Sequence, residues 1–141
     1  MKYICPICII DPSSHSFIKL RETDNLVYFY TCPSKAKLYF DKEGILNHYT
    51  GMLNEIPKGK KWVWIFDSID FGFKHIINFD ISIELAKLIS KFNETLERII
   101  IINPTSYISY TYTIIYPFLH NKVKKLIEFN YKDIISDNIY I

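Results

Sequence analysis

Trp62-Val63-Trp64-Ile65-Phe66-Asp67 is the stretch that decides the fold class of this chain. Its apolar residues stand in an unbroken row before the aspartate, without the alternation of a strand that has one face in water. Continuous apolarity is typical of a strand covered on both faces, as in a parallel sheet. The run Arg-Ile-Ile-Ile-Ile-Asn at 98–103 has the same character. We therefore predict two buried strands.

A helix is predicted between these two runs. Its apolar positions recur at helical spacing and are Leu85, Leu88, Ile89, Phe92 and Leu96. A strand, a helix and a second strand within about 40 residues form a right-handed βαβ crossover. This unit is the centre of the predicted fold.

Periodicity outside this unit adds further elements. A second helix is expected after Asp41, a good N-cap residue, and before Pro57. The apolar segment 108–119 carries apolar residues on nearly every side, and Pro117 should kink or end it. Other strands are expected at 3–10, 17–20, 26–31 and 126–129, with a short helix at 133–137. The chain is predicted to be one domain, 1–141: a three-layer α/β fold whose mostly parallel or mixed sheet of about five strands is flanked by helices.

Composition narrows the classes of function. The 141 residues are 49% hydrophobic with a net charge of only +2, whereas a nucleic-acid-binding domain usually carries a basic stripe. Arg21 and Arg98 are the only arginines, which further disfavours sequence-specific nucleic-acid binding. No apolar run reaches the roughly 20 residues of a membrane span. Three cysteines, an odd number, favour a reducing compartment, so we expect a cytoplasmic protein.

The search for catalytic motifs is negative. The chain has no glycine-rich phosphate loop, no nucleophile elbow, no paired-histidine zinc-protease helix and no EF-hand loop. The four histidines are scattered, at positions 15, 48, 75 and 120. We expect a protein that is not an enzyme and needs no cofactor.

Cys5-Pro-Ile-Cys8 is the most distinctive local motif. With His15 and Cys32 it could supply four zinc ligands. The alternative is that reduced cysteines in an apolar run pack as small hydrophobic side chains. A redox role needs the first cysteine at a helix N-terminus, and the strand predicted at 3–10 argues against it.

Asp67 and Asn103 stand at the carboxyl ends of the two predicted central strands, where open α/β sheets bind ligands. They could instead cap turns. Near them lies an apolar group consisting of Phe71, Phe73, Tyr110, Tyr112 and Phe118. A segment that is apolar on all sides must be covered on all sides. A domain of this size achieves that most simply if one face of the segment closes over an apolar ligand.

The stretch from Trp62 to Phe129 resembles the CRAL-TRIO lipid-binding domain of phosphatidylinositol- and tocopherol-transfer proteins. Residues 62–67 and 71–75 are similar to the central strand and the following loop of the family. Residues 92–96 (Phe-Asn-Glu-Thr-Leu) resemble its Tyr-Pro-Glu-Arg-Leu signature, and 101–104 (Ile-Ile-Asn-Pro) its Ile-Ile-Asn-x-Pro turn. Pro-Phe-Leu at 117–119 with the lysines that follow matches another motif in order and spacing. Asn93, Thr95 and Asp70 depart from the family pattern.

The resemblance implies a lipid-binding function without covalent chemistry. Glu94 and, after a one-residue deletion, Lys125 correspond to residues that serve the inositol headgroup in phosphatidylinositol-binding members. Residues 109–119 correspond to the gating helix, whose apolar side covers acyl chains. The expected ligand-binding residues are Glu94, Lys124, Lys125, Phe71, Phe73, Tyr110, Tyr112, Ile114 and Phe118. We expect a monomer that meets a membrane surface transiently, with a ligand-free protein-interaction module as the alternative.

Overall fold

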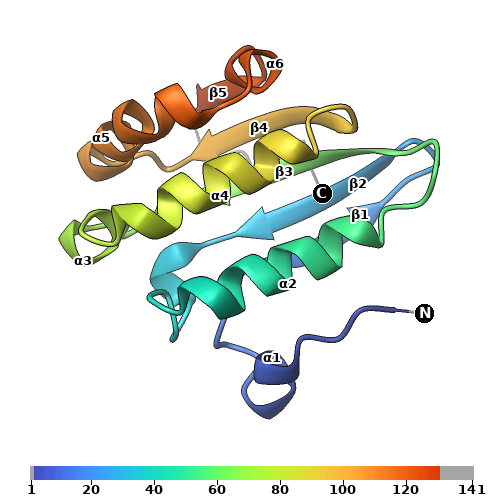
Figure 1. Ribbon diagram of the computed structural model, residues 1–141, viewed down its shortest axis with the longest axis horizontal. Coiled ribbons are helices and arrows are strands. Elements are labelled where there is room, and N and C mark those ends of the chain that lie inside the picture. The colour runs from blue at the N-terminus through green and yellow to red at the C-terminus, as the bar shows by residue number, and fades with distance from the viewer. Residues whose placement is uncertain (1, 131–141) are drawn as a thin grey trace.

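The computed structural model describes residues 2–130, which form a five-stranded sheet with helices packed against it (Figure 1). The strand order is β1-β2-β3-β4-β5. The first pair is antiparallel and the other three pairs are parallel, so the sheet is mixed. The strands are β1 (Ile18–Glu22), β2 (Leu26–Thr31), β3 (Lys61–Asp67), β4 (Leu96–Ile102) and β5 (Ile127–Asn130).

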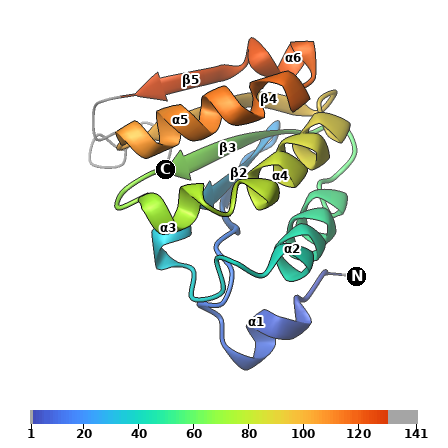
Figure 2. The same ribbon diagram turned by 60° about the vertical axis from the view of Figure 1, so that its left-hand side comes forward.

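Three helices connect the parallel strands: α2 (Lys42–Asn54), α4 (Phe79–Lys91) and α5 (Ser106–Ile115). All three lie on the same face of the sheet (Figure 2). This follows from the strand order, because successive right-handed crossovers that advance in one direction leave their helices on one side. The α/β class and the mixed sheet are confirmed, but residues 2–130 do not supply a third, helical layer on the other face. The short helices are α1 (Pro6–Ile10), η1 (Pro33–Lys35), α3 (Phe73–Ile76), η2 (Tyr116–Phe118) and α6 (Asn121–Lys124).

The two central strands are buried on both faces. In β3, Trp62 and Trp64 belong to the main core beneath the helices, whereas Val63 and Ile65 belong to a smaller cluster on the opposite face. The residues of β4 divide in the same way between the two clusters. The prediction from the continuous apolar runs at 62–66 and 99–102 is confirmed, since the side chains on both faces of these two strands are buried.

The predicted helices and strands shift slightly at their ends. The Asp41 side chain caps α2 by accepting a hydrogen bond from the Gly44 amide over 3.2 Å. Helix α4 ends at Lys91, so Leu96, which was counted with the helix, is the first residue of β4. The gating helix expected over 109–119 corresponds to α5, which ends at Ile115, and Pro117 sits in the 3-10 turn η2 that follows. The short helix predicted at 133–137 lies outside the described residues.

The prediction of a strand at residues 3–10 is wrong, because this segment contains the short helix α1 instead. Pro6 stands at the first position of the short helix α1, where a proline has the right φ angle and loses no hydrogen bond. Ile9 and Ile10 are 67% and 86% exposed. The apolar composition of this segment therefore does not reflect burial in the sheet.

Candidate functional site

Helix α5 covers one end of the sheet's helical face and forms one wall of a cavity. Thr105 starts the helix: its hydroxyl accepts a hydrogen bond from the Ile108 amide and donates one to the carbonyl of Phe71. This cap fixes where the helix begins and ties its first turn to the loop that follows β3. Four side chains of α5 face inward toward α4 and the sheet: Ile108, Thr111, Tyr112 and Ile115.

The cavity beneath α5 has a volume of about 80 Å³ and an almost entirely apolar lining. Its walls come from α4, α5 and strands β3, β4 and β5; they include Trp64, Phe66, Leu85, Ala86, Ile89, Ile99, Ile101, Leu119 and Ile127. An engineered cavity of roughly 150 Å³ in another protein admits benzene. The cavity as it stands is therefore too small for an acyl chain.

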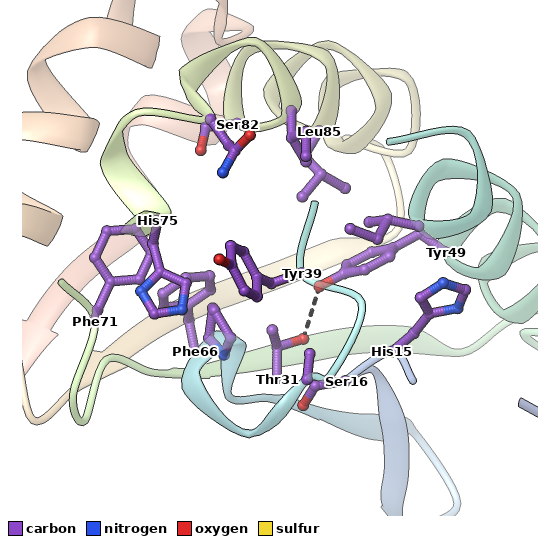
Figure 3. A pocket seen from close by; sticks show the side chains of 15 residues that line it. His15, Ser16, Thr31, Tyr39, Tyr49, Phe66, Phe71, His75, Ser82 and Leu85 are labelled. Atoms are coloured by element: carbon purple, nitrogen blue, oxygen red, sulfur yellow. Dashed lines mark hydrogen bonds between the residues drawn. The ribbon is translucent and has the colours of Figure 1, made fainter. Parts of the chain in front are cut away.

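A second cavity, also about 80 Å³, lies next to it between α2, α4 and the loop before α2. Figure 3 shows this cavity, with Phe71 and His75 on one side and Tyr49 and His15 on the other. Thr31 and Tyr49 share a hydrogen bond of 2.9 Å at its base. The two cavities have a common wall that consists of Phe66, Phe71, Ser82 and Leu85.

Two titratable side chains in the second cavity are shifted by burial. Burial lowers the pKa of His75, the Lys74 ammonium lowers it further, and the carbonyl of Pro33 opposes this. Burial raises the pKa of Tyr49 far above its usual value, although the hydrogen bond to Thr31 acts against it. Both groups are therefore neutral near pH 7, and the cavity contains no charge from them.

Only part of the predicted apolar lining faces the cavity beneath α5. Phe71 and Tyr112 line it. Tyr110, Ile114 and Phe118 point away and are 64%, 36% and 40% exposed, and Phe73 is 66% exposed. These four side chains therefore do not line the cavity as it stands, and their predicted role in ligand binding stays a prediction. The sequence reasoning did not identify Ile108, Thr111 and Ile115 as lining residues, because a segment that is apolar on nearly every side carries no signal of which side faces inward.

The exposed surface of α5 is mixed: Ser106, Ser109 and Thr113 are exposed beside a row of large apolar side chains. Tyr107, Tyr110 and Ile114 recur at helical spacing on the exposed side, and Phe118 follows at the same interval in η2. We call these four residues the outer stripe. Lysines lie beside it: Lys124 stands over the neighbouring ring of Tyr116 at 4.5 Å, and Lys87 over that of Phe118 at 5.3 Å.

Glu94 and Lys125 are both exposed and lie at the same end of the sheet, where β4 and β5 begin. Glu94 lies in the turn before β4, and Lys125 lies just before β5, which runs parallel to β4. The two side chains thus belong to adjacent turns, while Lys124 ends α6 next to them. Neither Glu94 nor Lys125 lines the two cavities described above.

Asp67 and Asn103 lie at the opposite end of the sheet, where β3 and β4 end, and are hydrogen-bonded to each other. The Asn103 amide donates to Asp67 Oδ1 over 3.0 Å, and the Tyr30 hydroxyl donates to Oδ2 over 2.6 Å. Burial, together with the Asp67 carboxylate, raises the pKa of Tyr30. The Ile69 amide also donates to Oδ1. With these donors in place, Asp67 caps the turn after β3, which was the alternative to a ligand-binding role for this residue.

The cysteine motif has different partners from those predicted. Cys5, Cys8 and His15 lie together, but the fourth residue beside them is His48 of α2. Cys32 is buried elsewhere, with its sulfur 3.4 Å from the Ser34 hydroxyl. Because Cys5 is the N-cap of α1, the argument against a redox role that rested on a strand no longer holds.

A comparison with protein families identifies the family of this chain. The model of the CRAL/TRIO domain matches residues 5–139, and the chain belongs to this family, whose domains bind and transfer lipids. A comparison with curated proteins found no match. Among residues 2–130, no helix has both the length and the apolarity needed to cross a bilayer.

Proposed function

We propose that this domain binds a phospholipid, preferably phosphatidylinositol, and transfers it or presents it at membranes. In this proposal the acyl chains occupy the space beneath α5, and α5 acts as the gate. Carriage of this kind needs no covalent chemistry and no cofactor. The domain acts as a cytoplasmic monomer that meets a membrane surface only transiently.

The observation that carries this proposal is that α5 exposes a row of large apolar side chains in addition to the apolar side that it buries. Its inner side lines an apolar cavity, and its outer stripe is exposed. A helix that only covers a core has a polar outer face. A gate, in contrast, must be compatible with lipid on both sides, since it covers acyl chains when closed and meets the bilayer when open.

Loading requires α5 to move away from the sheet. The cavity beneath it holds about 80 Å³, and the adjoining cavity of the same size is separated from it by Phe66, Phe71, Ser82 and Leu85. If α5 moves outward and the two phenylalanine rings rotate, the two cavities can join into one apolar channel along the sheet. Each buried CH₂ contributes about 0.8 kcal/mol, so a moderately long channel provides useful affinity.

The headgroup is assigned to the edge of the sheet where β4 and β5 begin. Lys125 would neutralise the phosphate as a point charge, and Glu94 would accept hydrogen bonds from ring hydroxyls. Lys122 and Lys124 flank this edge, and each lysine near an anionic membrane contributes about 1 kcal/mol of attraction. The edge therefore provides an orientation for docking as well as a headgroup site.

Mass spectrometry of lipids extracted from the purified full-length chain tests the proposal. A reproducible phospholipid at close to one molecule per chain supports it, as does uptake of phosphatidylinositol from vesicles of phosphatidylcholine and phosphatidylinositol. Protein that carries no lipid, and takes up none from these vesicles, would overturn it.

The small volume of the cavities favours a second candidate, a protein-interaction module that kept the fold and filled its interior with side chains. In that case the outer stripe is a contact surface for another protein rather than for a bilayer. Protein that stays free of lipid after incubation with vesicles is the result expected for such a module.

A further inference from the structure

Four side chains from the N-terminal segment and α2 converge on one point. Nδ1 of His15 lies 3.6 Å from the sulfurs of both Cys5 and Cys8, and Nδ1 of His48 lies 3.5 Å from the Cys8 sulfur. The four ligand atoms are all within 4.8 Å of one another. Cys5, His15 and His48 are buried, and Cys8 is half-buried.

These separations fit a tetrahedral zinc centre. With Zn–S of about 2.3 Å and Zn–N of about 2.0–2.1 Å, the sulfur–nitrogen edge of a tetrahedron is about 3.6 Å. The three sulfur–nitrogen distances in the cluster, 3.6, 3.6 and 3.5 Å, agree with this value. Two thiolates and two imidazoles also form a common donor set of structural zinc sites.

The outer nitrogens of both histidines are held in the manner that such a site requires. Nε2 of His48 lies 2.8 Å from the carbonyl of Phe17, which can only accept, so this nitrogen carries the proton. Nε2 of His15 lies 3.0 Å from the Asp41 carboxylate, which fixes the same tautomer. Each Nδ1 is thereby left with its lone pair directed at the cysteines. Histidines that bind metals usually donate their other N–H in this way.

Hydrophobic burial alone does not explain why α1 stays docked. The helix contains no buried residue, and an isolated helix of five residues is not stable in water. Side chains of the segment instead lie close against α2 where that helix has no Cβ: Tyr3 lies over Gly51, and Ile7 lies against Gly44. The four converging side chains provide the missing connection.

We propose that Cys5, Cys8, His15 and His48 bind a zinc ion as a structural site that fastens the N-terminal segment to α2. This inference is independent of the proposed lipid function. The two thiols lose their protons to solvent on binding, and the two thiolates balance the charge of the ion. A groove lined by Tyr3, Cys8, His15 and His48 gives the ion a path from solvent.

Metal analysis of the full-length chain, purified with reductant and without added chelator, tests the site directly. We expect about one zinc per chain. Cys8→Ser and His48→Gln should lose most of the metal; the glutamine amide can still donate to the Phe17 carbonyl, which helps the variant to fold. Cys32→Ser and His120→Gln are matched controls that should keep the wild-type zinc content.

A second measurement does not depend on the folding of variants. Wild-type protein stripped of metal and titrated with cobalt should develop the thiolate-to-cobalt charge-transfer and tetrahedral d–d bands at one equivalent. Asp41→Asn retains an N-cap residue for α2 but removes the charge opposite His15, so zinc affinity should fall about tenfold.

Three results would overturn the proposal. These are folded wild-type protein that binds neither zinc nor cobalt, a Cys32→Ser variant that loses as much metal as His48→Gln, and a Cys5–Cys8 disulfide in protein purified with zinc present. Circular dichroism of each variant separates metal loss from unfolding.

Discussion

Ile114 and Ile115 follow each other in α5 and therefore point about 100° apart around the helix axis. Ile115 lines the cavity above the sheet, whereas Ile114 does not line it and is 36% exposed. The same division runs along the whole helix, with Thr111 and Tyr112 inward and Tyr110 outward. The inner and outer sides of the proposed gate can therefore be altered separately.

Filling the cavity beneath α5 should prevent lipid loading. Ala86 lines this cavity, so Ala86→Leu places a larger side chain in the space an acyl chain needs. Overpacking costs about 1–3 kcal/mol at most sites, but here the existing void reduces this cost, and the fold should persist. Lipid per chain, measured by mass spectrometry after incubation with vesicles, should fall several-fold relative to the wild type.

Ala36→Leu is the comparison, because Ala36 lines the adjoining cavity, which a ligand enters only after the two cavities have joined; this variant should lose less lipid than Ala86→Leu. Two observations argue against the assignment of the ligand to the space beneath α5: equal loading in Ala86→Leu and wild type, or greater loss in Ala36→Leu.

Altering the outer stripe should impair membrane docking without emptying the pocket. Tyr110 is 64% exposed, and Tyr110→Glu replaces an apolar contact with a charge that anionic lipids repel. Sedimentation with vesicles containing phosphatidylinositol should show weaker association, while lipid already bound in the purified variant stays near the wild-type amount. Unchanged sedimentation would show that the outer stripe does not meet the bilayer.

The headgroup assignment depends on Glu94 and Lys125. The double variant Glu94→Ala/Lys125→Ala should reduce uptake of phosphatidylinositol about tenfold, with uptake of phosphatidylcholine unchanged, since charge-assisted contacts contribute about 1.5–3 kcal/mol. Glu55→Ala/Lys58→Ala removes the same charges from an exposed region at the end of α2 and serves as the control. Loss of both lipids in equal measure would refute the assignment.

His75 should make the domain less stable in mild acid. Its pKa in the folded state is below the unfolded value of about 6.5, so the unfolded chain binds more protons as the pH falls. The stabilisation from the neutral ring is complete above about pH 6.5 and decreases as the pH falls toward the folded pKa, by at most about 1.4 kcal/mol per pH unit. Urea titrations at pH 7, 6 and 5 should show this slope and show it reduced in His75→Gln. Identical slopes would be inconsistent with the burial of this ring.

Asp70 stands where the family pattern has glycine, and its φ angle of 55° lies in the left-handed region. Asp70→Gly should therefore relieve strain and raise the free energy of unfolding by up to about 1 kcal/mol. Asp24→Gly, in the exposed turn between β1 and β2, is the comparison, because Asp24 is not among the described residues with positive φ. Chemical denaturation measures both changes, and a destabilised Asp70→Gly would contradict the strain argument.

The sequence by itself determined the centre of the fold. The apolar runs at 62–66 and 99–102 and the helical spacing between them are local patterns, and each reflects how a single element is buried. The start of α2 at its N-cap Asp41 and the end of α5 before Pro117 are likewise determined by residues close together in the sequence. Together with the signature-like motifs, these local patterns were sufficient to indicate the family.

Only the tertiary structure decided which side of α5 faces inward, because a segment that is apolar all round contains no signal for its own rotation. It also decided the fourth partner of the cysteine motif. His48 lies 40 residues beyond Cys8, and the two meet only because α2 packs beside the N-terminal segment. The spacing of residues along the chain does not predict such contacts, because they depend on how separate elements pack against one another.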